Sequence, residues 1–151
     1  SGAILIYLAN KAERFISPDP RKHMEEIQWI MFQMANVGPM FGQTHHFRSK
    51  QEPEIAYART RYLRETHRLY GVMNSRLEAS EYLAGHDYGI ADIATWPWVS
   101  RFEWHEIDWA DYPHLRRWFD AIWERPAVKL GRAVPRVGAI WSGAFLEQDE
   151  S

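Results

Sequence analysis

The chain has 151 residues, of which 46% are apolar and 25% charged, with a formal net charge of −2 and no cysteine. This size and composition are typical of one folded domain, or of one domain plus a fragment, and argue against an intrinsically disordered chain. The absence of cysteine excludes disulfides, cysteine-ligated zinc, iron–sulfur clusters and a protein thiol nucleophile within this chain. The near-neutral charge gives no reason to expect nucleic acid or an anionic membrane as a partner. The longest apolar run, Ala3–Ala9, is too short to span a membrane and has no basic leader before it.

The first half of the chain predicts helices separated by proline and glycine. Residues 2–14 have the pattern of a short helix, and residues 15–20 form a linker because its two prolines cannot lie inside a helix. Apolar residues repeat every three or four positions over residues 21–36, which predicts an amphipathic helix. Gly38-Pro39 is expected to interrupt or kink this helix, and the polar stretch 45–53 is expected to be a loop.

The middle of the chain predicts a long helix and a second one with a defined start. Residues 54–79 carry one apolar face at helical spacing, and a connector follows over residues 81–87. Gly89 is the expected N-cap of the next helix, with Asp92 as the acidic residue at its third position. Pro97 falls inside this helix and is expected to bend it.

The last part of the chain predicts two further helices and a tail. Pro113 suits the first turn of one helix, and Arg125-Pro126 ends it and starts a short helix that reaches about Ala133. Residues 136–151 have mixed polarity and no period, so we expect a tail that packs on the surface. No segment has the alternation and turn residues of a strand. The predicted fold class is all-α.

Several motifs in this order resemble the cytosolic glutathione transferase superfamily. They are Ser1-Gly2-Ala3-Ile4-Leu5-Ile6-Tyr7-Leu8, then Gly85–Asp92 followed by Ile93-Ala94-Thr95-Trp96-Pro97-Trp98, and then Tyr112-Pro113-His114-Leu115 with Trp118 and Arg125-Pro126-Ala127-Val128. A narrower set is similar to the bacterial nu class, whose characteristic activity is glutathione-dependent disulfide reduction. This set comprises Gln28-Trp29, Gly38–Gln43, His45-His46-Phe47, Tyr57-Ala58, Arg61-Tyr62, Glu65 and Arg68-Leu69-Tyr70. Gly89 departs from the pattern, because the family usually has Ser or Thr there.

The resemblance implies a fold and a domain organisation. Residues 21–135 would form the all-helical C-terminal bundle of a glutathione transferase. Residues 1–14 would be the last helix of a thioredoxin-like domain that lies upstream of Ser1 and is missing, with residues 15–20 as the linker. The intact parent would be a cytoplasmic homodimer that binds glutathione and a small electrophile or disulfide, without a metal. Its catalytic residues would lie in the missing domain, so this chain contains none and is expected to be inactive alone.

The resemblance also implies site residues. Ser1 would meet the γ-glutamyl carboxylate of glutathione at a helix N-terminus, where free N–H groups favour an anion. Arg68 would turn into the interdomain cleft and grip a glutathione carboxylate with its guanidinium fork. For most of the arginines on the 54–79 helix, including Arg59, Arg61 and Arg64, a solvated face is the preferred interpretation.

A second group of residues would line the cleft for the second substrate. They are Phe41, Gln43, His45, Phe47 and Tyr62. A helix end with surface histidines is an equally good interpretation of the stretch after Gly38-Pro39. A metal site at His45-His46 is not expected, because adjacent helix residues diverge by about 100° and the i, i+4 pairing of zinc helices is absent. His105 and Asp108 are interpreted as a surface pair.

Two functions remain open from the sequence. The first is the helical part of a glutathione transferase, with conjugation and disulfide reduction both possible. The second is a non-catalytic domain of the same type that serves as a protein-binding module. No catalytic triad, phosphate-binding loop or paired-carboxylate motif is recognisable in the chain.

Overall fold

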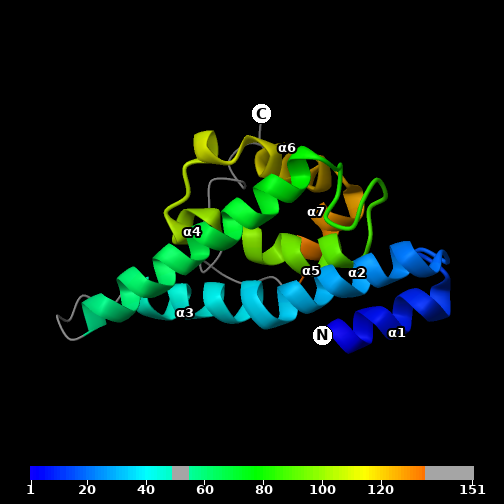
Figure 1. Cartoon of the computed structure of the whole chain (residues 1–151), viewed down its shortest axis with the longest axis horizontal. Coiled ribbons are helices and arrows are strands. Elements are labelled where there is room, and N and C mark those ends of the chain that lie inside the picture. Colours follow the sequence, from blue (N-terminus) through cyan, green and yellow to red (C-terminus); the bar gives the residue numbers. More distant parts are fainter. Residues whose placement is uncertain (49–54, 135–151) are drawn as a thin grey trace. The chain divides into compact units, whose positions relative to one another are not determined.

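A computed structural model describes residues 1–48 and 55–134 of the chain. Its helices, as drawn in Figure 1, are α1 (Gly2–Ala12), α2 (Pro20–Phe32), the π-helical turn η1 (Gln33–Val37), α3 (Gly38–Arg48), α4 (Ala56–Glu78), α5 (Ile90–Val99), the 3₁₀ turns η3 (Phe102–His105) and η4 (Trp109–Asp111), α6 (Pro113–Trp123) and α7 (Pro126–Arg132). Within the described residues there is no strand, only an isolated bridge between Tyr82 and Gly85. The all-α prediction is confirmed.

The chain divides into two compact units, one from Ser1 to Phe119 and one that begins at Asp120. In the second unit, the side chains of Lys129 and Arg132 on α7 lie over the ring of Trp123, and Lys129 also pairs with Glu124. The predicted tail over residues 136–151 lies outside the described residues.

The start of α2 is fixed by local chemistry. The side chain of Asp19 accepts hydrogen bonds from the backbone N–H groups of Arg21 and Lys22, both at 3.0 Å. Pro20 occupies the first helical position, where its missing N–H costs nothing. Pro20, the last residue of the predicted linker, therefore begins the helix.

The predicted interruption or kink at Gly38-Pro39 is confirmed in part, because a π-helical turn interrupts the α-helix just before Gly38 but does not end it. In Figure 1, α2, η1 and α3 run on from one another along one line. The π-helical turn immediately before Gly38 changes the hydrogen-bonding register, which accommodates the donor that Pro39 lacks.

The predicted loop over residues 45–53 is also wrong at its start, because α3 continues to Arg48. Tertiary contacts hold this last turn as a helix. The hydroxyl of Thr44 lies 2.8 Å from that of Thr66 on α4, and the imidazole of His45 lies 2.7 Å from that of His105. Residues 49–53 lie outside the described part of the chain.

The core of the first unit is formed by side chains from α2, η1, α3, α4, α5, the connector before α5 and the start of α6. Its fully buried side chains include Ile30, Val37, Phe41, Leu69, Tyr70, Met73, Leu77, Leu83, Leu115, Trp118 and Phe119. The indole N–H of Trp96 donates to the carbonyl of Phe119 at 3.1 Å, so this tryptophan is held in the core as well. None of the helices in the described residues is long and apolar enough to cross a membrane.

Candidate functional site: an arginine groove, a histidine pair and the junction at α5

Ser1 lies at the N-cap of α1. Its hydroxyl makes no capping bond to the helix and lies 3.8 Å from the sulfur of Met34 in η1. Gly2 is buried against Met34 and Ile30, and a Cβ there would lie 3.0 Å from the Met34 side chain. The α1 N-terminus is therefore packed directly on the π-helical turn, with the Ser1 side chain exposed at its edge.

An open groove of about 690 Å³ runs along the exposed side of α4. It is lined by Met40 of α3 and by Tyr57, Thr60, Arg61, Tyr62, Arg64, Glu65 and Arg68 of α4. The three arginines are exposed, and their spacing of three and four residues places them along one stripe. Among the described residues, no carboxylate forms an ion pair with Arg61 or Arg64. The stripe can therefore accept an anionic ligand.

Arg68 differs from its two neighbours, because its guanidinium is already paired. Its Nε and Nη2 atoms donate to the two carboxylate oxygens of Glu65 at 2.9 and 2.7 Å. These hydrogen bonds lower the pKa of Glu65. The pair is solvent-exposed and is screened by water, so an incoming carboxylate competes with Glu65 at modest cost.

The structure does not gather the five second-substrate residues in one place. Phe47 stacks on Tyr62, with ring centroids 5.5 Å apart, and Tyr62 lines the groove. Gln43 is exposed on α3. Phe41 is fully buried and stacks on Tyr70, while His45 is half-buried.

His45, His105 and Tyr70 form a hydrogen-bonded chain inside the first unit. The Nε2 atoms of the two histidines are 2.7 Å apart, and the Tyr70 hydroxyl lies 2.8 Å from Nδ1 of His105. The interpretation of His105 as a surface residue paired with Asp108 was wrong, since its exposed fraction is 0%. The turn η3, which carries His105, packs on α3 and α4. The His105 imidazole therefore meets His45 and Tyr70, which are distant in sequence.

Two neutral tautomer patterns satisfy this chain. In one, Tyr70 donates to His105, whose Nε2–H donates to His45. In the other, His45 donates to His105, whose Nδ1–H donates to the Tyr70 oxygen. Both patterns need each imidazole to carry a single proton. Among the described residues, no group of three or more His, Asp or Glu side chains is placed to hold a metal ion.

Burial makes this histidine pair acid-sensitive. It lowers the pKa of His105 to about 2 and that of His45 to about 4, and the nearby positive charges of Arg101 and, for His45, of Arg48 act in the same direction. An unfolded chain takes up these protons near pH 6.5, whereas the folded chain resists them. The stabilising contribution is therefore complete above pH 6.5 and is lost as the pH falls toward 4.

We expect the free energy of unfolding to fall less steeply between pH 6.5 and 4.5 in a His45→Gln variant than in the unmodified chain. Glutamine can still hydrogen-bond to His105 but does not titrate. Urea denaturation at a series of pH values measures the slope. His86→Gln, at an exposed histidine, should keep the original slope. Equal slopes for the unmodified chain and His45→Gln would contradict the assignment.

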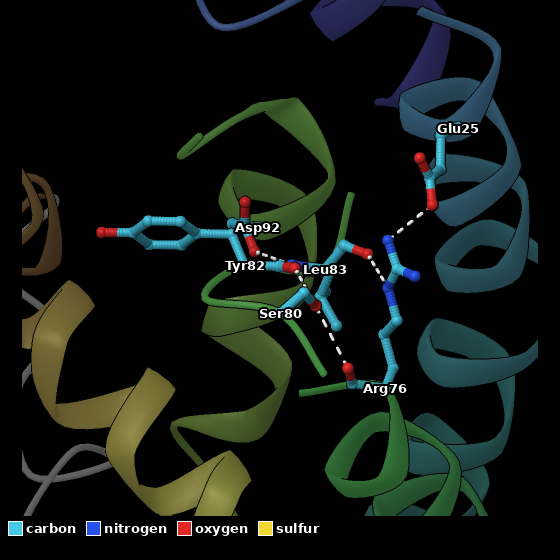
Figure 2. A network of polar contacts seen from close by, with 6 residues as sticks. All are labelled: Glu25, Arg76, Ser80, Tyr82, Leu83 and Asp92. Atoms are coloured by element: carbon cyan, nitrogen blue, oxygen red, sulfur yellow. Dashed lines mark hydrogen bonds and ion pairs between the residues drawn. The ribbon is translucent and has the colours of Figure 1, made fainter. Parts of the chain in front are cut away.

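The buried carboxylate of Asp92 joins three segments, namely the connector, the first turn of α5 and α6. This side chain accepts hydrogen bonds from the backbone N–H groups of Leu83 and Gly89, both at 3.0 Å, and from the indole N–H of Trp118 at 2.7 Å. Figure 2 shows the carboxylate beside Leu83, whose carbonyl accepts from Arg76, which in turn pairs with Glu25. The prediction that Gly89 and Asp92 open the helix is confirmed.

Glu26 of α2 supplies the capping group that Gly89 lacks. Its carboxyl group accepts a hydrogen bond from the backbone N–H of Ala91 at 3.1 Å, and a Cβ placed on Gly89 would overlap it. The carbonyl of Phe15 in the linker accepts from the N–H of Ile90 at 2.9 Å. The first N–H groups of α5 are thus satisfied by α2, by the linker and by Asp92 itself.

These features define an all-helical domain with a capped α5 junction and a cationic groove on α4. The family model "Glutathione S-transferase, C-terminal domain" matches residues 29–126. The chain belongs to this family.

Two curated relatives come from Escherichia coli (strain K12). Disulfide-bond oxidoreductase YfcG is 48% identical over 127 residues, which are 84% of this chain and 59% of that protein. Disulfide-bond oxidoreductase YghU is 36% identical over 143 residues, or 90% of this chain and 50% of that protein. The chain thus spans between a half and three fifths of these relatives.

Solved structures of glutathione transferases have the same fold. One from Burkholderia graminis, with two glutathione molecules bound per subunit, matches with a TM-score of 0.83 and 43% identity over 91% of this chain and 60% of that one. One from Pseudomonas putida, with one glutathione disulfide bound per subunit, matches with a TM-score of 0.80 and 37% identity over 89% of this chain and 61% of that one.

Three residues of these sites had no functional role predicted from the sequence. Tyr70 belongs to the Arg68-Leu69-Tyr70 segment that resembles the nu class but was given no role, Glu26 carried no signal, and His105 was placed on the surface. The glycine at position 89 was the one usable clue, because an N-cap without a side chain leaves a donor for another segment to satisfy.

Proposed function

We propose that this chain is the helical part of a glutathione-dependent enzyme that reduces disulfides. The observation that carries the proposal is the groove on α4, where three arginines accompany two tyrosines. Guanidinium groups suit the carboxylates of glutathione, whereas a site for an apolar electrophile would be lined mainly by apolar side chains. The proposal is supported by the two E. coli relatives, which are named disulfide-bond oxidoreductases, and by the glutathione and glutathione disulfide bound in the two solved structures.

In this proposal the thiols come from glutathione, because the chain has no cysteine. One glutathione thiolate attacks the substrate disulfide, forms a mixed disulfide and releases one thiol. A second glutathione then attacks the mixed disulfide, which gives glutathione disulfide and the second thiol. The groups that stabilise the thiolate would belong to a thioredoxin-like part outside this chain. A cytoplasmic location follows, since glutathione is kept reduced there.

We assign the binding roles as follows. Ser1, whose hydroxyl makes no capping bond, would receive the γ-glutamyl carboxylate at the α1 N-terminus. Arg68 would exchange Glu65 for a carboxylate of glutathione, assisted by Arg61 and Arg64. Tyr62, backed by Phe47, would form a wall for the disulfide, with Gln43 at its exposed edge. Phe41 and His45, which contact Tyr70 and His105 instead, would not touch the substrate.

The exposed apolar face of α1 supports the proposal that a further polypeptide segment packs on it in the intact enzyme. Ile4, Tyr7 and Leu8 are 63%, 62% and 51% exposed, although the opposite face of the same helix is packed on its own unit. A helix that is apolar on both faces is normally covered on both. We propose that a thioredoxin-like segment covers this face and that the intact protein is a homodimer.

We expect an Arg68→Gln substitution to raise the KM for glutathione or for the disulfide about tenfold while kcat changes little. The reason is that a charge-assisted hydrogen bond contributes about 1.5–3 kcal/mol and would act equally on bound substrate and transition state. The assay is glutathione-dependent reduction of a small disulfide by this chain extended at Ser1 with a thioredoxin-like domain. Arg59→Gln, on the same helix but outside this groove, is the matched control.

The same assay separates the alternatives. If KM were unchanged in Arg61→Gln, Arg64→Gln and Arg68→Gln, the groove would not be part of the substrate site. Turnover by the 151-residue chain alone would contradict the placement of the thiol-activating groups. An extended protein that binds no glutathione and reduces no disulfide would instead indicate a non-catalytic binding module.

A further inference from the structure

The carboxyl group of Glu26 is buried at a junction between three segments. Its side chain is 5% exposed, comes from α2, and fills the space beside Gly89 at the first turn of α5. The linker meets the same turn through the carbonyl of Phe15. A pocket of about 470 Å³ lies against this junction and includes Glu26 and the linker residues 15–18 in its lining.

Two opposing effects act on this carboxyl group. The helix N-terminus and the N–H of Ala91 favour the carboxylate. Burial and the neighbouring acidic groups disfavour it, and they outweigh the hydrogen bond, because they raise the pKa of Glu26 to about 7. The buried Glu26 carboxyl therefore keeps its proton near neutral pH. The same side chain would release this proton if the junction opened and water solvated it.

The charged and titratable groups that surround Glu26 come from every segment packed at the junction. They are Lys22 and Glu25 of α2, Arg76 of α4, His86 and Asp87 of the connector, and Asp92 of α5. Arg76 is engaged with Glu25 and with the Leu83 carbonyl, as Figure 2 shows, and so does not neutralise Glu26 directly. The carboxyl group of Asp92 is also buried at this helix turn.

We propose that Glu26 is a proton-operated clamp, which holds the linker and α2 on the first turn of α5 when it is protonated and loosens this junction when it is charged. Opening of the junction would solvate the carboxylate and separate it from Asp92. The direction of the pH effect follows from the raised pKa. The stabilising contribution is complete below pH 4.5 and is lost as the pH rises through about 7.

Amide hydrogen exchange of the 151-residue chain tests this clamp. The N–H groups of Ile90 and Ala91, which bond to Phe15 and Glu26, report on the junction. Their protection factors, corrected for the intrinsic pH dependence of exchange, should fall about tenfold between pH 6 and pH 8. This ratio is expected if the Glu26 carboxyl has a pKa of about 7 in the closed junction and its ordinary pKa of 4.5 in the open one.

A Glu26→Gln variant should have protection factors at Ile90 and Ala91 that do not change over this range, because the amide keeps an acceptor and cannot ionise. Glu78→Gln, at an exposed position of α4, should behave as the unmodified chain does. A carbon-13 titration of the Glu26 carboxyl in the unmodified chain gives an answer even if the variant does not fold. A midpoint near 4.5, or equal pH profiles for the unmodified chain and Glu26→Gln, would overturn the proposal.

Discussion

A Gly89→Ser variant should be less stable than the unmodified chain by about 1–3 kcal/mol, the usual cost of overpacking a buried site. Serine is a favoured N-cap residue, so local rules predict a small gain instead. The structure reverses the sign, because the new Cβ would overlap the carboxylate of Glu26. Either Glu26 must leave the N–H of Ala91 or the first turn of α5 must shift.

Shortening Glu26 should rescue this variant. In the double variant Glu26→Ala/Gly89→Ser, the serine hydroxyl can cap α5 and no carboxylate competes for the space. Urea denaturation of the unmodified chain, the two single variants and the double variant gives the coupling free energy, which we expect to be favourable and about 1–3 kcal/mol. Gly71→Ser is the control, since a Cβ at Gly71 meets nothing within 4 Å. Simple additivity of the two substitutions would refute the capping role of Glu26.

An Asp92→Ala variant should lose about 3 kcal/mol or more. The substitution leaves three donors without their acceptor, namely the N–H groups of Leu83 and Gly89 and the indole of Trp118. Each buried donor left unsatisfied costs about 1–3 kcal/mol, against a total stability of about 5–15 kcal/mol for a typical domain. Thermal and urea unfolding, followed by circular dichroism, measure the loss.

Two further variants set the scale for this result. Asp92→Asn keeps one oxygen but turns an N–H₂ group toward a donor, so it should lie between Asp92→Ala and the unmodified chain. Asp111→Ala, at an exposed aspartate in η4, should change the stability by less than about 0.5 kcal/mol. If the stability of Asp92→Ala remained within about 1 kcal/mol of that of the unmodified chain, the Asp92 side chain would not hold this junction together.

The elements of this chain were predictable because their signals are local. Pro113 starts α6 and Pro126 starts α7, as predicted, each through the effect of one side chain on its own turn. Asp19 and Pro20 start α2 in the same way, one residue before the start that was predicted. The form of the interruption predicted at Gly38-Pro39 was not predictable, for the opposite reason. Whether a proline ends a helix depends on how the preceding turn is packed, and here a π-helical turn lets the helix continue.

The candidate site was predictable only in part. The stripe of Arg61, Arg64 and Arg68 follows from helical spacing alone, so the sequence placed these arginines on one face. Only the structure shows that both carboxylate oxygens of Glu65 accept hydrogen bonds from the guanidinium of Arg68. Phe41 and His45 were grouped with Phe47 and Tyr62 by the family resemblance. The structure places Phe41 and His45 against Tyr70 and His105, whereas Phe47 stacks on Tyr62. Successive residues of a helix point in different directions, so a shared segment does not ensure a shared site.

The sequence by itself determined the all-α class, the helix starts, the family resemblance and the absence of a protein thiol. These depend on residue types and on spacings of a few positions, which act before the chain is compact. Only the tertiary structure decided that His105 meets His45 and Tyr70, and that Glu26 fills the place of a missing N-cap side chain. These partners are separated by 35 to 65 positions along the chain. No local signal encodes such pairings, because they exist only once packing brings buried polar groups within hydrogen-bonding distance of one another.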